Sequence, residues 1–221
     1  MYPLDPKDIR QIPKDKIISA RIGSDVDNYM HYAVKAKRID AVKFLLRDVP
    51  EIDLLAKNSM GQSALHLAIR SNMPSMVKIL VLKNHKNTEQ VEQVVRNLKI
   101  DDIKGNLCAK VVKMLQSQNN KGMSPLISCV DHGNYEIFRF IIDITVHIQK
   151  TQAKQPVLVK TIDLKDERQE TAMIKAVRLC RMQMAYTFLH MIGPTEMLAY
   201  ASVTQTDSTG KNVLHHAVMT K

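Results

Sequence analysis

The sequence predicts an all-α protein that is built from about five copies of a two-helix repeat. Only 7 Gly and 8 Pro occur in 221 residues, too few for an all-β protein with many tight turns. Short segments with apolar residues at helical spacing recur in pairs along the chain. Hydrophobic residues make up 45% of the chain and aromatic residues 5%. We therefore expect packed helices around a mainly aliphatic core.

The clearest copy of the repeat lies in the first half of the chain. Ser63 stands where a helix N-cap is expected, and small or apolar residues follow it from Ala64 to Ile69. A second apolar helix is predicted from Met76 to Val81. Pro74 lies near its beginning, where a missing backbone N–H costs little. A short capped helix followed by a second apolar helix therefore defines the repeat.

The same pattern occurs three more times, and a fifth copy at 210–217 has only the first helix; insertions separate the copies. Equivalent positions of the first helix fall at residues 31, 66, 127, 174 and 215, so successive copies are 35, 61, 47 and 41 residues apart. We predict an N-terminal segment at 1–23, followed by an array over 24–221 with repeats near 25–57, 58–83, 120–145, 167–193 and 207–221. Insertions are predicted near 84–118, 146–165 and 194–206.

The largest insertion, 84–118, is itself predicted to be helical. Apolar residues recur at helical spacing in two stretches, Val91–Leu98 and Ala109–Leu115, with Gly105 and Asn106 as a break between them. The alternative is a decayed extra repeat, because 61 residues is close to two periods of roughly 33 residues. The segment contains no trace of the Leu-His-x-Ala core, which favours a helical insertion.

These copies resemble ankyrin repeats, whose signature is G-x-T-P-L-H-x-A followed by a helix of the form I-V-x-x-L-L. Gly61–Ala68 (GQSALHLA) and Gly122–Cys129 (GMSPLISC) carry the signature, and its His recurs as His31, His66 and His215. The resemblance covers about two thirds of the chain. It implies an ankyrin-repeat solenoid of antiparallel helix pairs, in which a loop projects before each pair.

The resemblance also assigns core positions. It implies close helix contacts at Ala33, Ala68, Cys129, Ala176 and Ala217. It implies core side chains on the first helices at Leu65, Leu126, Met173 and Leu214, and on the second helices at Leu45, Leu80, Ile141 and Phe188. The signature His is implied to hold the loop of a neighbouring repeat by hydrogen bonds and not to take part in catalysis.

Within the ankyrin family, residues 58–69 and 73–77 resemble the second repeat of the inhibitor-of-NF-κB (IκB) proteins, where N-x-x-x-Q-T-P-L-H-L-A-V precedes a Pro-led helix. Residues 124–127, with Val130 and Asn134, resemble a later repeat of the nuclear, Bcl-type members. The excess of 32 Lys and Arg over 22 Asp and Glu fits those members better than the acidic cytoplasmic ones. The resemblance implies a regulator of signalling or transcription in the cytoplasm or nucleus. Its partner would be a Rel-type factor or another signalling protein.

Family positions carried onto this sequence give a set of candidate partner-binding residues. On the loop tips they are Ser59, Met60, Gln62, Lys121 and Arg168; on the first helices they are Lys35, Arg70, Ser71, Asp131, His132 and Arg178. Lys35, Arg70 and Arg178 fall at equivalent positions, so stacking predicts a basic track that Asp131 and His132 interrupt. With a formal net charge of +10, the favoured ligand is an acidic protein segment.

Other functions are weaker predictions from the residues. Direct nucleic-acid binding is the first alternative, but the basic residues lack aromatic interleaving and a recognisable motif. A second alternative is a targeting module for an enzyme on a longer chain. We expect no catalytic residues, cofactor or metal, because phosphate-binding, hydrolase and zinc motifs are missing and three Cys lie at wide spacings. No apolar run is long enough to predict a membrane span.

Overall fold

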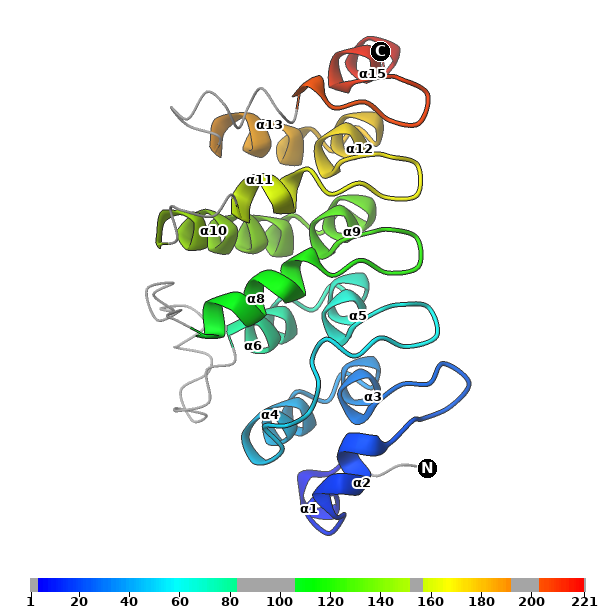
Figure 1. Ribbon diagram of the computed structural model, residues 1–221, viewed down its shortest axis with the longest axis vertical. Coiled ribbons are helices and arrows are strands. Elements are labelled where there is room, and N and C mark those ends of the chain that lie inside the picture. The colour runs from blue at the N-terminus through cyan, green and yellow to red at the C-terminus, as the bar shows by residue number, and fades with distance from the viewer. Residues whose placement is uncertain (1–3, 83–105, 152–156, 192–202, 221) are drawn as a thin grey trace. The chain divides into compact units, whose positions relative to one another are not determined.

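The computed structural model describes residues 4–82, 106–151, 157–191 and 203–220. Within these ranges the chain forms helices and no strand, as the sequence predicted (Figure 1). The chain divides into two compact units, residues 1–102 and 103–221. Each unit is described separately.

The N-terminal unit contains two helix pairs that share one arrangement. Its helices are α1 (Pro6–Ile9), α2 (Lys14–Ser19), α3 (Tyr29–Lys35), α4 (Ile39–Asp48), α5 (Ala64–Arg70) and α6 (Pro74–Leu82). α3 packs against α4, α5 packs against α6, and α3 and α5 pack against each other. We call α3 and α5 inner helices and α4 and α6 outer helices. The loops that precede the two inner helices project to the same side (Figure 1).

The segment before the first repeat is folded onto it. Ile9 of α1 and Ile17 of α2 are buried, and α1 packs against α4. The Arg10 guanidinium lies over the Phe44 ring, 5.5 Å from its centroid. A repeat cannot bury both of its apolar faces alone, so α1 and α2 give the first repeat the cover that later repeats receive from their neighbours.

The C-terminal unit repeats the pairing and adds further helices. It contains α8 (Asn106–Gln116), α9 (Pro125–His132), α10 (Tyr135–Thr151), α11 (Val157–Ile162), α12 (Ala172–Arg178), α13 (Met182–Met191) and α15 (Val213–Met219). Inner helix α12 packs against inner helices α9 and α15 and against its own outer helix α13. The rings of Phe138 on α10 and Phe188 on α13 meet edge to face, with centroids 5.0 Å apart.

α8 and α11 are helices added in the insertions. α8 packs against α9, α10 and α11, and α11 packs against α10. Val111 and Leu115 of α8 are buried, whereas Ala109 is exposed, so the buried face differs in part from the predicted one. The first predicted stretch, Val91–Leu98, lies outside the described residues, as does most of the predicted insertion at 194–206.

All five inner helices begin with the same local structure. Their N-cap residues are Asn28, Ser63, Ser124, Thr171 and Asn212, each with extended backbone. The residue two positions earlier has positive φ in every case: Val26, Gly61, Gly122, Gln169 and Gly210. A Cβ atom on Gly122 would lie only 3.0 Å from the backbone of Asp166, so glycine permits the close approach of two loops there.

The predicted core holds for four repeats and fails for the fifth. Leu65, Leu126 and Met173 are each at most 1% exposed. Leu214, at the equivalent position, is 62% exposed, so the prediction that it belongs to the core was wrong. α15 packs against α12, and its apolar residues Leu214, Val218 and Met219 are all exposed.

His31 connects the two repeats of the N-terminal unit. Its Nε2 donates to the carbonyl oxygen of Gln62 at 2.9 Å, while its Nδ1 accepts from the backbone N–H of Asn28 at 3.3 Å. The carbonyl acceptor requires a proton on Nε2, and Nδ1 also lies 2.6 Å from the Asn28 side-chain oxygen. His31 therefore holds a neighbouring loop, as the family resemblance implied, whereas the hydrogen bonds of His215 join it to Asn212 of its own repeat.

We predict that Leu65→Ala lowers the free energy of unfolding by about 2–5 kcal/mol, because it opens a cavity in a packed core. Leu214→Ala, the same change at the equivalent position, should cost no more than about 0.5 kcal/mol, as at an ordinary surface site. Urea denaturation followed by circular dichroism measures both. Similar losses in the two variants would contradict the assignment of Leu65 to the core.

A second prediction concerns pH. Burial lowers the pKa of the His31 imidazole, so the unfolded chain binds a proton more readily than the native protein does. The contribution of His31 is therefore fully present above about pH 6.5 and is lost as the pH falls below it. The free energy of unfolding of His31→Gln should fall less steeply than that of wild type between about pH 7.5 and 5.5. Parallel curves would show that His31 titrates equally in both states.

Candidate functional site

The loops before the inner helices have a common internal structure. We call residues 22–27, 58–62, 119–123, 166–170 and 207–211 the finger loops. In the last four, an Asn or Asp five residues before the N-cap folds the loop. The Asn58 side-chain oxygen accepts from the backbone N–H groups of Met60 and Gln62, both at 3.0 Å. Asn119, Asp166 and Asp207 make the equivalent pairs of bonds.

Neighbouring finger loops are joined by backbone hydrogen bonds. In the N-terminal unit, the N–H of Ser59 donates to the carbonyl oxygen of Asp25 at 2.7 Å. In the C-terminal unit, Glu167 donates to Lys121 and Ser208 donates to Arg168, both at 3.0 Å. These bonds fix the backbone at the tips. The side chains of Ser59, Met60, Lys121 and Arg168, all predicted binding residues, remain exposed.

The end of each inner helix carries a recurring polar position. Seven residues after the N-cap lie Lys35, Arg70, Asp131 and Arg178. In three repeats this side chain contacts the residue just before the N-cap, eight positions back along the chain. The pairs are Lys35 with Asp27, Arg70 with Gln62, and Arg178 with Glu170. We call each of these contacts an end pair.

Two of the end pairs are ion pairs. Lys35 Nζ lies 2.5 Å from Asp27 and 2.6 Å from Asp25. Burial opposes its charged form, but the hydrogen bonds that Lys35 donates to the two carboxylates outweigh this and raise the pKa of Lys35. Arg178 donates to both carboxylate oxygens of Glu170, at 2.5 and 2.9 Å, and these bonds raise the pKa of Arg178.

This pairing changes the interpretation of the predicted basic track. Lys35 and Arg178 are half-buried and matched by acids of their own repeats, so their charges are largely neutralised before a ligand arrives. Arg70 is exposed, and its Nη1 meets the neutral side-chain oxygen of Gln62 at 3.4 Å. The three cations are therefore equivalent in position but not in electrostatic environment.

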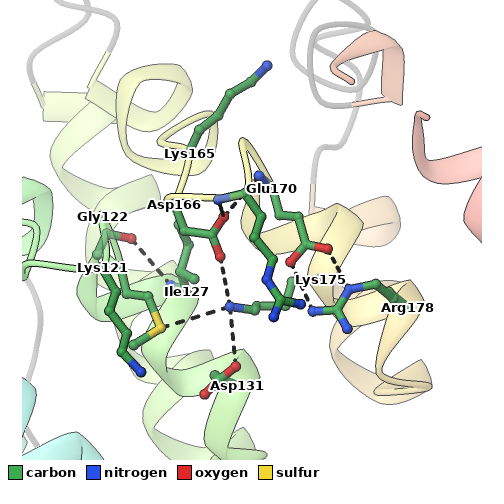
Figure 2. A network of polar contacts seen from close by, with 12 residues as sticks. Lys121, Gly122, Ile127, Asp131, Lys165, Asp166, Glu170, Lys175 and Arg178 are labelled. Carbon is green, nitrogen blue, oxygen red and sulfur yellow. Dashed lines mark hydrogen bonds and ion pairs between the residues drawn. The ribbon is translucent and has the colours of Figure 1, made fainter. Parts of the chain in front are cut away.

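The third repeat differs from this pattern, because Met123 takes the place of the acid and Asp131 the place of the base. Asp131 Oδ1 instead lies 3.2 Å from Lys175 Nζ, on the inner helix of the next repeat. Lys175 also donates to Asp166 Oδ2 at 2.8 Å. Figure 2 shows Lys175 between the two carboxylates. The Met123 sulfur lies 3.9 Å from Lys175 Nζ.

Three predicted binding residues remain: His132, Ser71 and Gln62. His132 is exposed, and its Nδ1 lies 3.5 Å from Asp131. Ser71 is exposed at the C-cap of α5. Gln62 is only 9% exposed, so its side chain supports Arg70 instead of pointing freely from a loop tip.

The sequence analysis missed Lys175, Asp27, Asp166 and Glu170. A lysine on a helix normally reaches solvent, yet Lys175 is only 5% exposed. One signal could have indicated the end pairs: an acid followed eight residues later by a base, as at positions 27 and 35 and again at 170 and 178. The spacing indicates an end pair only where the N-cap of the inner helix lies one residue after the acid.

The described residues contain no group of three or more His, Cys, Asp or Glu side chains that could hold a metal ion. Burial raises the pKa of the Cys129 thiol strongly, so this side chain behaves as a small apolar group. Cys180 is exposed. Among the helices that the structure describes, none is both long and apolar enough to span a bilayer.

Comparison with known proteins identifies the repeat. Residues 14–91 match the family model described as ankyrin repeats (3 copies). No curated protein matches the chain significantly. The prediction of an all-α fold is confirmed for the residues that the structure describes, and the prediction of ankyrin repeats is confirmed for residues 14–91. Ankyrin repeats indicate a scaffold for protein–protein interaction.

We predict that Lys175→Met lowers the free energy of unfolding by about 3 kcal/mol, because it leaves the buried Asp166 carboxylate without its cation. Lys121→Met, the same change at an exposed finger-loop position, should stay within about 0.5 kcal/mol of wild type. Guanidinium denaturation of both variants gives the comparison. Equal stability of the two variants would show that the Lys175 network contributes nothing to folding.

Proposed function

We propose that this ankyrin-repeat protein is a binding scaffold that recognises an acidic segment of a signalling or transcription protein. The observation that carries the proposal is the set of exposed side chains on finger loops whose backbones are hydrogen-bonded to one another. A fixed backbone lets these side chains bind without a large loss of loop entropy. The loops themselves are held by buried Asn and Asp side chains, so their tips can vary without loss of the fold.

Charge supports an acidic ligand. The formal net charge is +10, and in the C-terminal unit Lys121 and Arg168 are exposed on neighbouring finger loops that Glu167 joins through its backbone. Complementary charge speeds association and selects among partners. An acidic protein segment fits this surface better than an apolar one.

The resemblance to IκB repeats supports the cellular role. Residues 58–69, which carry that resemblance, lie inside the segment that matches the ankyrin model. They form the second finger loop and α5, with a capping box between Ser63 and His66. An IκB-like role would place the protein in the cytoplasm or nucleus with a Rel-type or other signalling partner.

A charge-reversal experiment tests the proposal. Lys121→Glu with Arg168→Glu changes two finger-loop residues of the C-terminal unit, and Lys110→Glu with Lys113→Glu changes two exposed residues of α8 in the same unit. Both double variants have the same net charge. Affinity purification from the native cell with quantitative mass spectrometry should show partners that the finger-loop variant loses and the α8 variant keeps.

Purified partners then give the direct measurement. Calorimetry with a recovered partner should show weakening by about tenfold or more for the finger-loop variant, because like charges then face the ligand. Equal losses in both variants would contradict the proposal and indicate association driven by general charge. Binding of unrelated duplex DNA with a steep salt dependence would identify nucleic acid as the partner.

A further inference from the structure

The end pairs of the second and fourth repeats differ in one functional group, which is an amide in Gln62 and a carboxylate in Glu170. In the fourth repeat the residue before the N-cap is Glu170, whose two oxygens hold the Arg178 guanidinium at 2.5 and 2.9 Å. In the second repeat it is Gln62, whose amide oxygen meets one nitrogen of Arg70 at 3.4 Å. The helix position, the loop position and the eight-residue separation are the same in both repeats.

Burial makes this difference important for binding. The Glu170 side chain is 4% exposed, so a ligand carboxylate that took Arg178 would leave a buried carboxylate without its partner, at a large cost in free energy. Gln62 is 9% exposed but neutral. Loss of one long hydrogen bond to an amide costs much less, and the acid that acts on Arg70, Asp25, forms its ion pair with Lys35.

We propose that the residue before the N-cap decides whether the cation at the end of the inner helix is available to a ligand. Gln62 leaves Arg70 available to a carboxylate of the partner, and we call this cation open. Glu170 keeps Arg178 in an ion pair within its own repeat, and we call this cation closed and Glu170 its closing residue. This inference rests on the acidic partner of the proposed function and names the residue that contacts it.

Of the other three repeats, the first also has a cation at this position, and it follows the same rule. Lys35 is closed by Asp25 and Asp27, and the third repeat presents Asp131, which is itself held by Lys175. The fifth repeat has Met219 at this position. Among the repeats that the structure describes, Arg70 is the cation at this position that is paired with a neutral side chain.

An exchange of the two closing residues tests the proposal without altering the composition. The double variant Gln62→Glu with Glu170→Gln has the same residues and the same net charge as wild type. In each of these two backgrounds, Arg70→Gln and Arg178→Gln are made separately, so that every comparison removes one positive charge. The probe is a fluorescent octaglutamate peptide at low salt, with octaglutamine as the neutral control, and anisotropy gives the dissociation constant.

In wild type, Arg70→Gln should weaken octaglutamate binding by about fivefold, the fold-change for an exposed ion pair near the upper end of its range. Arg178→Gln should change it by less than about twofold. In the exchanged background the order should reverse, because Arg178 then faces an amide and Arg70 a carboxylate. Urea denaturation confirms that each variant is folded at the assay temperature.

The possible failures are distinguishable. Equal effects of the two arginines in both backgrounds, with octaglutamate still preferred over octaglutamine, would overturn the closing rule and leave the acidic partner intact. No preference for octaglutamate in wild type would overturn both the rule and the acidic partner. Neither result would bear on the finger-loop scaffold, which the charge-reversal experiment tests by itself.

Discussion

Each of the last four repeats depends on one short side chain that stands five residues before its inner helix. Asn58, Asn119, Asp166 and Asp207 each accept two backbone N–H groups of their own finger loop. Buried N–H groups must find acceptors, and here the acceptor comes from within the loop. The folded loop then places the N-cap, the carbonyl oxygen that a neighbouring His can bind, and the acid or amide of the end pair.

The choice between amide and carboxylate at this position has a further effect. Asn58 and Asn119 are neutral amides, whereas Asp166 and Asp207 are carboxylates that each contact a nitrogen nine residues later, on Lys175 and on the His216 ring. Burial opposes the charge of Asp207, but hydrogen bonds from Thr209 and His216 hold its pKa well below the usual range. The last two repeats therefore contain a carboxylate at a position that is an uncharged amide in the second and third repeats.

The helices could be predicted from the sequence because they depend on local signals. Ser63 and Ser124 cap inner helices whose apolar spacing is clear, and α8 begins at Asn106, the second residue of the predicted break. The exposure of Leu214 could not be predicted, because burial depends on the neighbour and not on the residue's own repeat. The same limit applies to charge. Helical spacing alone places Lys35 and Arg178 at exposed helix ends and gives no partner for their charges. The acids that pair with them lie on the finger loops, and the structure is needed to show these contacts.

The backbone and the side chain of Gln62 have different roles. Its backbone carbonyl accepts the His31 bond that joins two repeats, and its side chain meets Arg70. A change of side chain therefore leaves the inter-repeat bond in place. The codons for Gln and Glu differ only in their first base, so one nucleotide change could alter the ligand preference of this surface while its architecture persists. Partner choice in such a protein can drift during evolution at little cost to folding.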